Sequence, residues 1–309
     1  MNSDNAFFDA PSGGGESRAA FARLTGRVFW FLILYEAVLF LLFALLGSAL
    51  PDRYLTMLLC VGAGVCAVIL PNGGLLPAEK LFARSERKMT PGTLLIFLGL
   101  IPGLQLLASL LCDLCALLGL DPNTASADIG PDAGFTAVLY ACLLGPIAEE
   151  VLFRGFTLGL LKKGGAAAAI VISALCFGLM HMNPAQFIAG TLAGLLLGWV
   201  LCRYSLFWCC VLHIYNNLVL SYLPGLLSAA LPDPAAAALP EMIFFIAAGV
   251  AAAVLGAPRF KRALREMKAE EASRLAESGQ LKHGIFRCLP FYIYVLLLVF
   301  LTYINARSA

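Results

Sequence analysis

Residues 135–161 read FTAVLYACLLGPIAEEVLFRGFTLGLL, an apolar stretch whose charged residues are Glu149, Glu150 and Arg154. It is longer than the about 20 residues that a helix needs to cross a hydrocarbon core about 30 Å thick. A charged side chain at the centre of such a helix costs about 2.5–3.5 kcal/mol on insertion scales. The stretch therefore predicts a membrane-spanning helix whose charged residues serve a specific purpose.

The rest of the chain has the same membrane character. Of its 309 residues, 61% are hydrophobic and 13% are charged, whereas a soluble domain carries about 25% charged residues. The predicted fold class is all-α, a polytopic transmembrane helix bundle of about eight or nine spans. The apolar runs that predict these spans lie at 28–50, 54–70, 92–120, 135–161, 165–183, 185–202, 205–226, 240–257 and 289–305.

Basic residues gather in alternate connecting segments. Residues 258–288 carry eight Lys and Arg residues, whereas residues 121–134 and 227–239 carry Asp but neither Lys nor Arg. Because Lys and Arg favour cytoplasmic loops, the pattern predicts a cytoplasmic N-terminus and a C-terminus on the outer side. The predicted location is integral to a membrane, with a bacterial inner membrane favoured. The sequence contains no basic patch with interleaved aromatic residues, so it does not indicate a nucleic-acid partner.

The two glutamates of the central stretch face different directions. Glu150 and Arg154 are four residues apart on one helix face, so they can form an ion pair. Glu149 is turned about 100° away from Glu150 and has no partner on its own helix. A carboxylate without a partner suits a general base.

Two later spans carry further polar residues in apolar surroundings. Phe177 and His181 share one helix face, and His213 and Asn217 share another, with Asn216 on a neighbouring face. Burying a polar group without a partner is costly. We therefore expect these groups to meet in a polar cavity between the helices.

Together the three segments resemble the signatures of the CPBP family, which comprises CAAX proteases and bacteriocin-processing intramembrane peptidases. Its pattern is E-E-x-x-x-R, then F-x-x-x-H, then H-x-x-x-N, and residues 135–222 contain all three in this order. The resemblance implies an intramembrane endopeptidase that hydrolyses peptide bonds at the membrane. It implies the catalytic residues Glu149, Glu150, His181, His213 and Asn217, with Arg154, Phe177 and Asn216 in support.

Two chemistries fit these residues. In the first, Glu149 and His181 activate a water molecule, while His213 and Asn217 donate hydrogen bonds to the oxyanion. In the second, Glu149, His181 and His213 bind Zn²⁺ and leave a position open for water. No cofactor is favoured, because the chain has no H-E-x-x-H motif; Zn²⁺ stays an open alternative.

The expected partners are membrane lipid and a peptide or protein substrate, either prenylated or a leader peptide. A transporter or proton-relay protein is the main alternative, since buried Glu and His residues also mark ion pathways. A catalytically silent scaffold or immunity factor of the same fold is another.

The predicted organisation has four parts. Residues 1–25 form a disordered cytoplasmic N-terminus, and residues 26–134 form the N-terminal transmembrane helices. Residues 135–226 form the catalytic transmembrane core. Residues 227–309 form the C-terminal helices, with a basic cytoplasmic segment near 258–288.

Three further features need an explanation. Gly190, Gly194 and Gly198 form a stripe on one face of a predicted span, which indicates close packing against another helix. Glu36 and Asp113 are further acidic residues away from the ends of predicted spans. We expect each of them to pair with another helix or to face a cavity.

Overall fold

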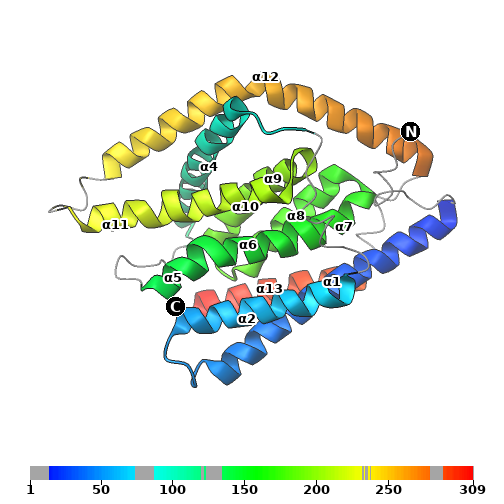
Figure 1. Cartoon of the computed structure of the whole chain (residues 1–309), viewed down its shortest axis with the longest axis horizontal. Coiled ribbons are helices and arrows are strands. Elements are labelled where there is room, and N and C mark those ends of the chain that lie inside the picture. The colour runs from blue at the N-terminus through cyan, green and yellow to red at the C-terminus, as the bar shows by residue number, and fades with distance from the viewer. Residues whose placement is uncertain are drawn as a thin grey trace.

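The computed structural model describes residues 14–73, 87–119, 122, 134–231, 233, 236, 238–278 and 288–308. In these ranges every regular element is a helix, which confirms the all-α class (Figure 1). The α-helices are α1 (Gly14–Leu46), α2 (Arg53–Ile69), α4 (Pro91–Leu117), α5 (Phe135–Val138), α6 (Gly145–Glu150), α7 (Gly159–Leu161), α8 (Ala166–Met180), α9 (Pro184–Arg203), α10 (Leu206–Ile214), α11 (Leu223–Ala229), α12 (Ala238–Ser278) and α13 (Leu289–Ser308).

Wider π-helical turns connect several of these helices without a break. The turns η3 (Leu139–Leu144) and η4 (Val151–Leu158) join α5, α6 and α7 into one helical stretch, and η6 (Tyr215–Tyr222) joins α10 to α11. Short 3₁₀ turns, η2 (Leu70–Asn72) and η5 (Lys162–Gly164), follow α2 and α7.

The described helices fit a protein that crosses a membrane many times. Seven helical stretches are long and apolar enough to span a membrane, and Ala166–Met180 and Leu289–Asn305 are shorter apolar helices. Every predicted span therefore has an apolar helix at its place in the chain. The chain is an integral membrane protein of the polytopic helical type.

Two predicted boundaries differ from the structure. Residues 14–25 were expected to be disordered, yet they begin α1, because the Ala-rich residues 18–24 are good helix formers. Residues 1–13 lie outside the described residues. The span expected to end at residue 257 continues to Ser278 as one helix, α12, which accommodates Pro258 in its interior.

Much of the predicted charge alternation cannot be followed in the structure. Residues 74–86, 123–133 and 279–287, which include His283, lie outside the described residues. The predicted orientation of the two termini therefore stays a prediction.

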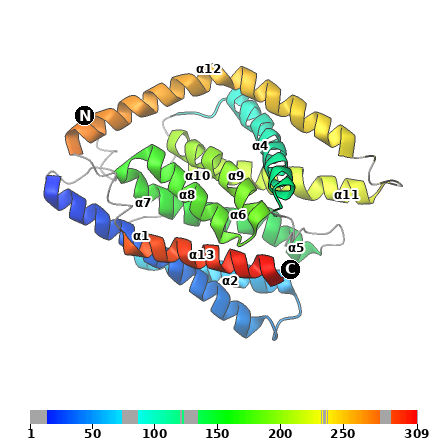
Figure 2. The ribbon, with the colours of Figure 1, turned by 180° about the vertical axis from the view of Figure 1, so that it is seen from behind.

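The bundle has a central group of helices between two outer groups. Figures 1 and 2 show the stretch from α5 to α7 together with α8, α9 and α10 in the middle of the molecule. On one side of them lie α1, α2 and α13, and on the other side lie α4 and α12. The central group carries the three sequence motifs.

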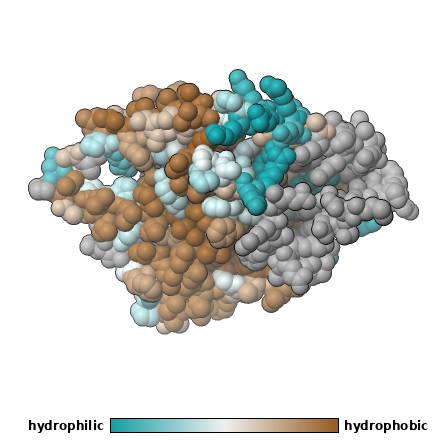
Figure 3. All heavy atoms as spheres, turned by 45° about the horizontal axis from the view of Figure 1, so that its top comes forward, coloured by the Kyte–Doolittle hydropathy of each residue, from teal (hydrophilic) through white to brown (hydrophobic). Residues whose placement is uncertain are grey.

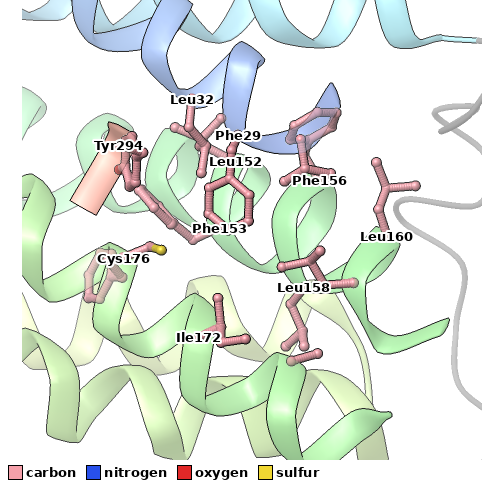
Figure 4. Close-up of a cluster of buried hydrophobic side chains, with 14 of the residues drawn as sticks. Phe29, Leu32, Leu152, Phe153, Phe156, Leu158, Leu160, Ile172, Cys176 and Tyr294 are labelled. Carbon is pink, nitrogen blue, oxygen red and sulfur yellow. The ribbon is translucent and has the colours of Figure 1, made fainter. Parts of the chain in front are cut away.

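A buried cluster of aromatic and aliphatic side chains holds the central group against α1 and α13 (Figure 4). Phe153 of η4 packs in it with Phe29 of α1 and Tyr294 of α13, all of them fully buried. Since lipid tails are as apolar as these side chains, close packing rather than exclusion of water stabilises the cluster. The cluster fixes the helical turn that follows Glu149 and Glu150.

The glycine stripe on α9 packs directly against α8, as its spacing indicates. A Cβ atom on Gly194 would lie 2.9 Å from the Cα of Ala174, and one on Gly198 would lie 3.1 Å from a methyl carbon of Ile170. A Cβ on Gly190 would approach the Cα of Gly178 to 3.3 Å. The two backbones are therefore as close as glycine permits.

We expect Gly194→Ala to destabilise the protein by about 1–3 kcal/mol, because the added methyl group overpacks a tight helix contact. Thermal unfolding of the purified protein in detergent measures the effect. Gly62→Ala in α2 is the matched control, because a Cβ there meets nothing within 4 Å. Equal melting temperatures for the two variants would contradict this account of the α8–α9 contact.

Glu36 is buried in α1 and has no hydrogen-bond partner in the part of the chain that the structure describes. Its side chain is 1% exposed, and neither carboxylate oxygen has a hydrogen-bond partner among the described residues. Asp113 is exposed on α4. The expected pairing with another helix is therefore not seen for Glu36 within the described part of the chain.

Glu36→Leu is expected to raise the melting temperature, because it removes a buried polar group whose unpartnered atoms cost about 1–3 kcal/mol each. Glu36→Gln, which keeps the shape and the polarity, is expected to gain less. Thermal unfolding measures the melting temperatures of both variants. A marked loss of stability in Glu36→Leu would mean that the carboxyl group has a stabilising partner.

Candidate active site

The first and third motifs lie where α-helical turns widen into π-helical turns. Glu149 and Glu150 end α6 immediately before η4, and His213 lies in the last turn of α10, just before η6. Such widened turns occur frequently at functional sites, since they change the direction of the side chains that follow.

Glu150 is the buried centre of the site. Its Oε1 atom accepts a hydrogen bond from Nδ1 of His213 at 2.9 Å and lies 3.1 Å from Nη1 of Arg154. The side chains of Glu150 and Arg154 are both 0% exposed. The ion pair predicted from the four-residue spacing is therefore confirmed. The contact between Glu150 and His213, which joins α6 to α10, was not predicted.

Glu149 lies on the other side of the same imidazole. Its Oε2 atom is 3.7 Å from Nε2 of His213, and its side chain is 17% exposed. This separation is too long for a direct hydrogen bond, and a water molecule beside the two atoms could bridge them. His213 thus has Glu150 at one ring nitrogen and Glu149 at the other.

Phe177 packs against three members of the site. The guanidinium carbon of Arg154 lies 4.2 Å from the centre of the Phe177 ring, a cation–π contact. The rings of His181 and His213 stand nearly perpendicular to it, with centroids 5.1 and 5.6 Å away. Phe177 therefore packs against Arg154 and both imidazoles.

His181 follows the last residue of α8 and is half-buried. Its Nδ1 atom lies 2.9 Å from the backbone oxygen of Phe177. Donation from Nδ1 to this carbonyl leaves Nε2 as the ring's acceptor. The contacts found for the described residues join His181 to Phe177, but they include no hydrogen bond or ion pair between His181 and Glu149.

A chain of three amides lies beside His213. Gln105 of α4 donates to Oδ1 of Asn216 at 2.7 Å, and Asn216 donates to Oδ1 of Asn217 at 2.9 Å. Asn217 donates in turn to the backbone oxygen of Ala141 at 2.9 Å. Gln105 was missed from the sequence, although a Gln inside an apolar span is a signal of its own.

A small cavity lies beside these amides, between α4, α9 and α10. It has a volume of about 20 Å³, and its polar lining consists of Gln105, His213 and Asn216. Such a volume is enough for about one water molecule. The rest of the lining is apolar, including Leu196 and Leu212.

The alternative zinc site does not fit the arrangement of side chains. Among the described residues, no three His, Cys, Asp or Glu side chains form a group that could hold a metal ion. Glu149 and His213 are close to each other, whereas His181 contacts Phe177 instead. We therefore derive no step through a metal.

Comparison with known families gives one match. Residues 131–219 match the family described as Type II CAAX prenyl endopeptidase Rce1-like. Searches of curated proteins and of solved structures give no match. The matched segment runs through all three motifs, from Glu149 to Asn217. Over this segment the chain is similar to the CAAX/CPBP family of intramembrane peptidases.

Proposed function

We propose that this protein is an intramembrane endopeptidase of the CAAX-protease type, which hydrolyses peptide bonds with a water molecule held between Glu149 and His213. One observation carries the proposal. Within an apolar helix bundle, a partly exposed carboxylate and an imidazole nitrogen face each other across 3.7 Å, with a family match over the same residues.

The geometry supports different roles for the two glutamates, Glu149 and Glu150. Glu150, paired with Arg154, accepts a hydrogen bond from Nδ1–H of His213, which leaves the Nε2 lone pair to face Glu149. A water in the gap would donate one O–H to Glu149 and the other to Nε2. Its oxygen lone pair then faces outward, where a peptide carbonyl can approach.

In the proposed reaction the water oxygen bonds to the carbonyl carbon while Glu149 takes a water proton. The tetrahedral intermediate then breaks its C–N bond, and the proton passes from Glu149 to the leaving amine. General base catalysis of this kind contributes about 10²–10⁴-fold. His213 is the neighbour of Glu149 in this scheme, in place of the His181 expected from the sequence.

Asn217 and His181 are proposed to be catalytic residues, as the sequence predicts. The described contacts of Asn217 use one of its two amide N–H groups, so the other can donate to the oxyanion. The rings of His181 and His213 both pack against Phe177, which supports a place for His181 beside the site. Cleavage by His181→Ala at the wild-type rate would remove His181 from the mechanism.

The substrate is proposed to be a membrane-associated peptide. The family match favours a prenylated peptide, and a leader peptide is the alternative. The charge pattern of the sequence supports a cytoplasmic N-terminus and an outer C-terminus, with a bacterial inner membrane as the proposed location.

The test is a cleavage assay on the purified full chain in detergent, with prenylated and unprenylated versions of one peptide and mass spectrometry of the products. We expect cleavage of the prenylated peptide, and we expect it to persist in the presence of a chelator. Activity lost with chelator and restored by Zn²⁺ would favour the metal-dependent alternative. Folded protein that cleaves neither peptide would favour the scaffold or transport alternatives.

A further inference from the structure

A second and larger cavity lies away from the peptidase site. It has a volume of about 380 Å³ and is formed by the start of α4, the end of α9 and the second half of α12. Its lining on α4 comes from residues 90–97, whereas the small cavity beside His213 is lined by residues 101–105 of the same helix. The two cavities are therefore separate sites along one helix.

The larger cavity is strongly basic. Its charged lining consists of one carboxylate, Glu266, and four arginines, Arg87, Arg203, Arg259 and Arg262. Arginine cannot lose its proton in a protein, so the lining keeps an excess of positive charge. Figure 3 shows hydrophilic residues gathered together on a face that is otherwise largely hydrophobic.

The cavity already contains one anionic group of the chain itself. Oε2 of Glu266 lies 2.8 Å from Nη1 of Arg87 and forms an ion pair with Arg203 as well. Arg203 is 6% exposed, so a buried guanidinium forms part of the cavity floor. Arg259 and Arg262 are exposed at its rim. The single carboxylate of Glu266 cannot neutralise all four arginines of the lining, so an excess of positive charge stays.

Aromatic side chains form the opposite wall. Trp199 of α9 packs against Phe97 of α4 and Phe260 of α12, with ring centroids 5.6 and 4.9 Å apart. Tyr204 packs on Trp199 at the end of α9. Trp and Tyr gather where a membrane meets water, so this wall places the cavity at the level of lipid headgroups.

We propose that this cavity binds the phosphate group of an anionic lipid headgroup and thereby joins α12 to α4 and α9. Guanidinium groups bind phosphate in bidentate geometry, and basic cavities between transmembrane helices bind anionic headgroups. The hydroxyls of Thr90 and Thr93 in the lining add further donors. Free phosphate offers the same chemistry, so the test separates the two sources. The proposal does not depend on the peptidase function.

The test uses the full chain in detergent micelles of neutral headgroup. Phosphatidylglycerol is titrated in one series, phosphatidylcholine in a second and inorganic phosphate in a third. Native mass spectrometry counts the bound lipid, and the melting temperature reports its effect on stability. We expect one phosphatidylglycerol to remain bound and to raise the melting temperature, whereas phosphatidylcholine does neither.

Two double variants decide whether the cavity is responsible. Arg259→Gln with Arg262→Gln removes two rim charges, and we expect it to weaken phosphatidylglycerol binding by about tenfold or more. Lys261→Gln with Arg265→Gln removes the same charge from exposed positions of α12 outside the cavity lining. This control is expected to bind as the wild type does.

Each outcome bears on the proposal. Displacement of the lipid by inorganic phosphate would support a site that also takes free phosphate. Retention of the lipid in excess phosphate would support recognition of the whole headgroup. Equal binding by the two double variants, or no preference for phosphatidylglycerol over phosphatidylcholine, would overturn the proposal.

Discussion

Glu149→Gln is expected to lower the rate of peptide cleavage by about 10²–10⁴-fold, the share that a general base contributes. Glutamine has almost the shape of glutamate but cannot take a proton from water. Because Glu149 is partly exposed and more than a hydrogen-bond length from His213, we expect the melting temperature to change little. The cleavage assay and thermal unfolding together measure both effects.

Asp113→Asn is the matched control for this substitution. It makes the same chemical change at an exposed acidic residue of α4, and we expect it to leave the cleavage rate unchanged. A Glu149→Gln variant that cleaves at the wild-type rate would remove Glu149 from the mechanism. An inactive and unfolded variant would instead place Glu149 among the residues that stabilise the fold.

Arg154→Ala is expected to destabilise the protein by about 3–5 kcal/mol, the cost of breaking a buried ion pair by removing one partner. It leaves the fully buried carboxylate of Glu150 without its counter-charge and also removes the contact with the Phe177 ring. Thermal or denaturant unfolding of the purified variant checks the effect.

A double variant separates stability from activity at this pair. Glu150→Leu combined with Arg154→Met removes both charges together, and such replacements are often neutral for stability. We expect it to recover most of the stability that Arg154→Ala loses. It should stay inactive, because His213 no longer has Glu150 to hold its ring. Full activity in this double variant would contradict the orienting role given to Glu150.

The sequence alone predicted those contacts that follow from the spacing of residues along a single helix. The pair formed by Glu150 and Arg154 follows from a spacing of four residues, and the structure contains it. The packing of the α9 glycines follows in the same way from a stripe on one helix face. Apolar runs also placed the spans, because their length is set by the membrane.

Contacts between helices could not be predicted in this way. The predicted span boundaries left Glu149, His181 and His213 spread over roughly 12 Å along the membrane axis, at 1.5 Å per residue. In the structure Glu149 and His213 lie within 3.7 Å. The π-helical turns beside both residues, η4 and η6, change the helical register, and the sequence carries no simple signal for them.

Residues near the ends of helices were also missed. Arg203 directly follows the predicted span 185–202, and Glu266 lies in the predicted basic segment near 258–288. The structure joins them in an ion pair within a cavity. The partner of Arg203 lies on the part of α12 that follows the predicted end of the span at residue 257. A pairing between two helices depends on how those helices pack.

A double-mutant cycle on Glu149 and His213 tests the central claim, that both residues hold one water molecule that attacks the peptide bond. Cleavage rates are measured for Glu149→Gln, for His213→Gln and for the double variant. Residues that act as a unit are strongly non-additive, so we predict that the double variant is no slower than the slower single variant. Rate losses that multiply in the double variant would show independent action and would contradict the shared water.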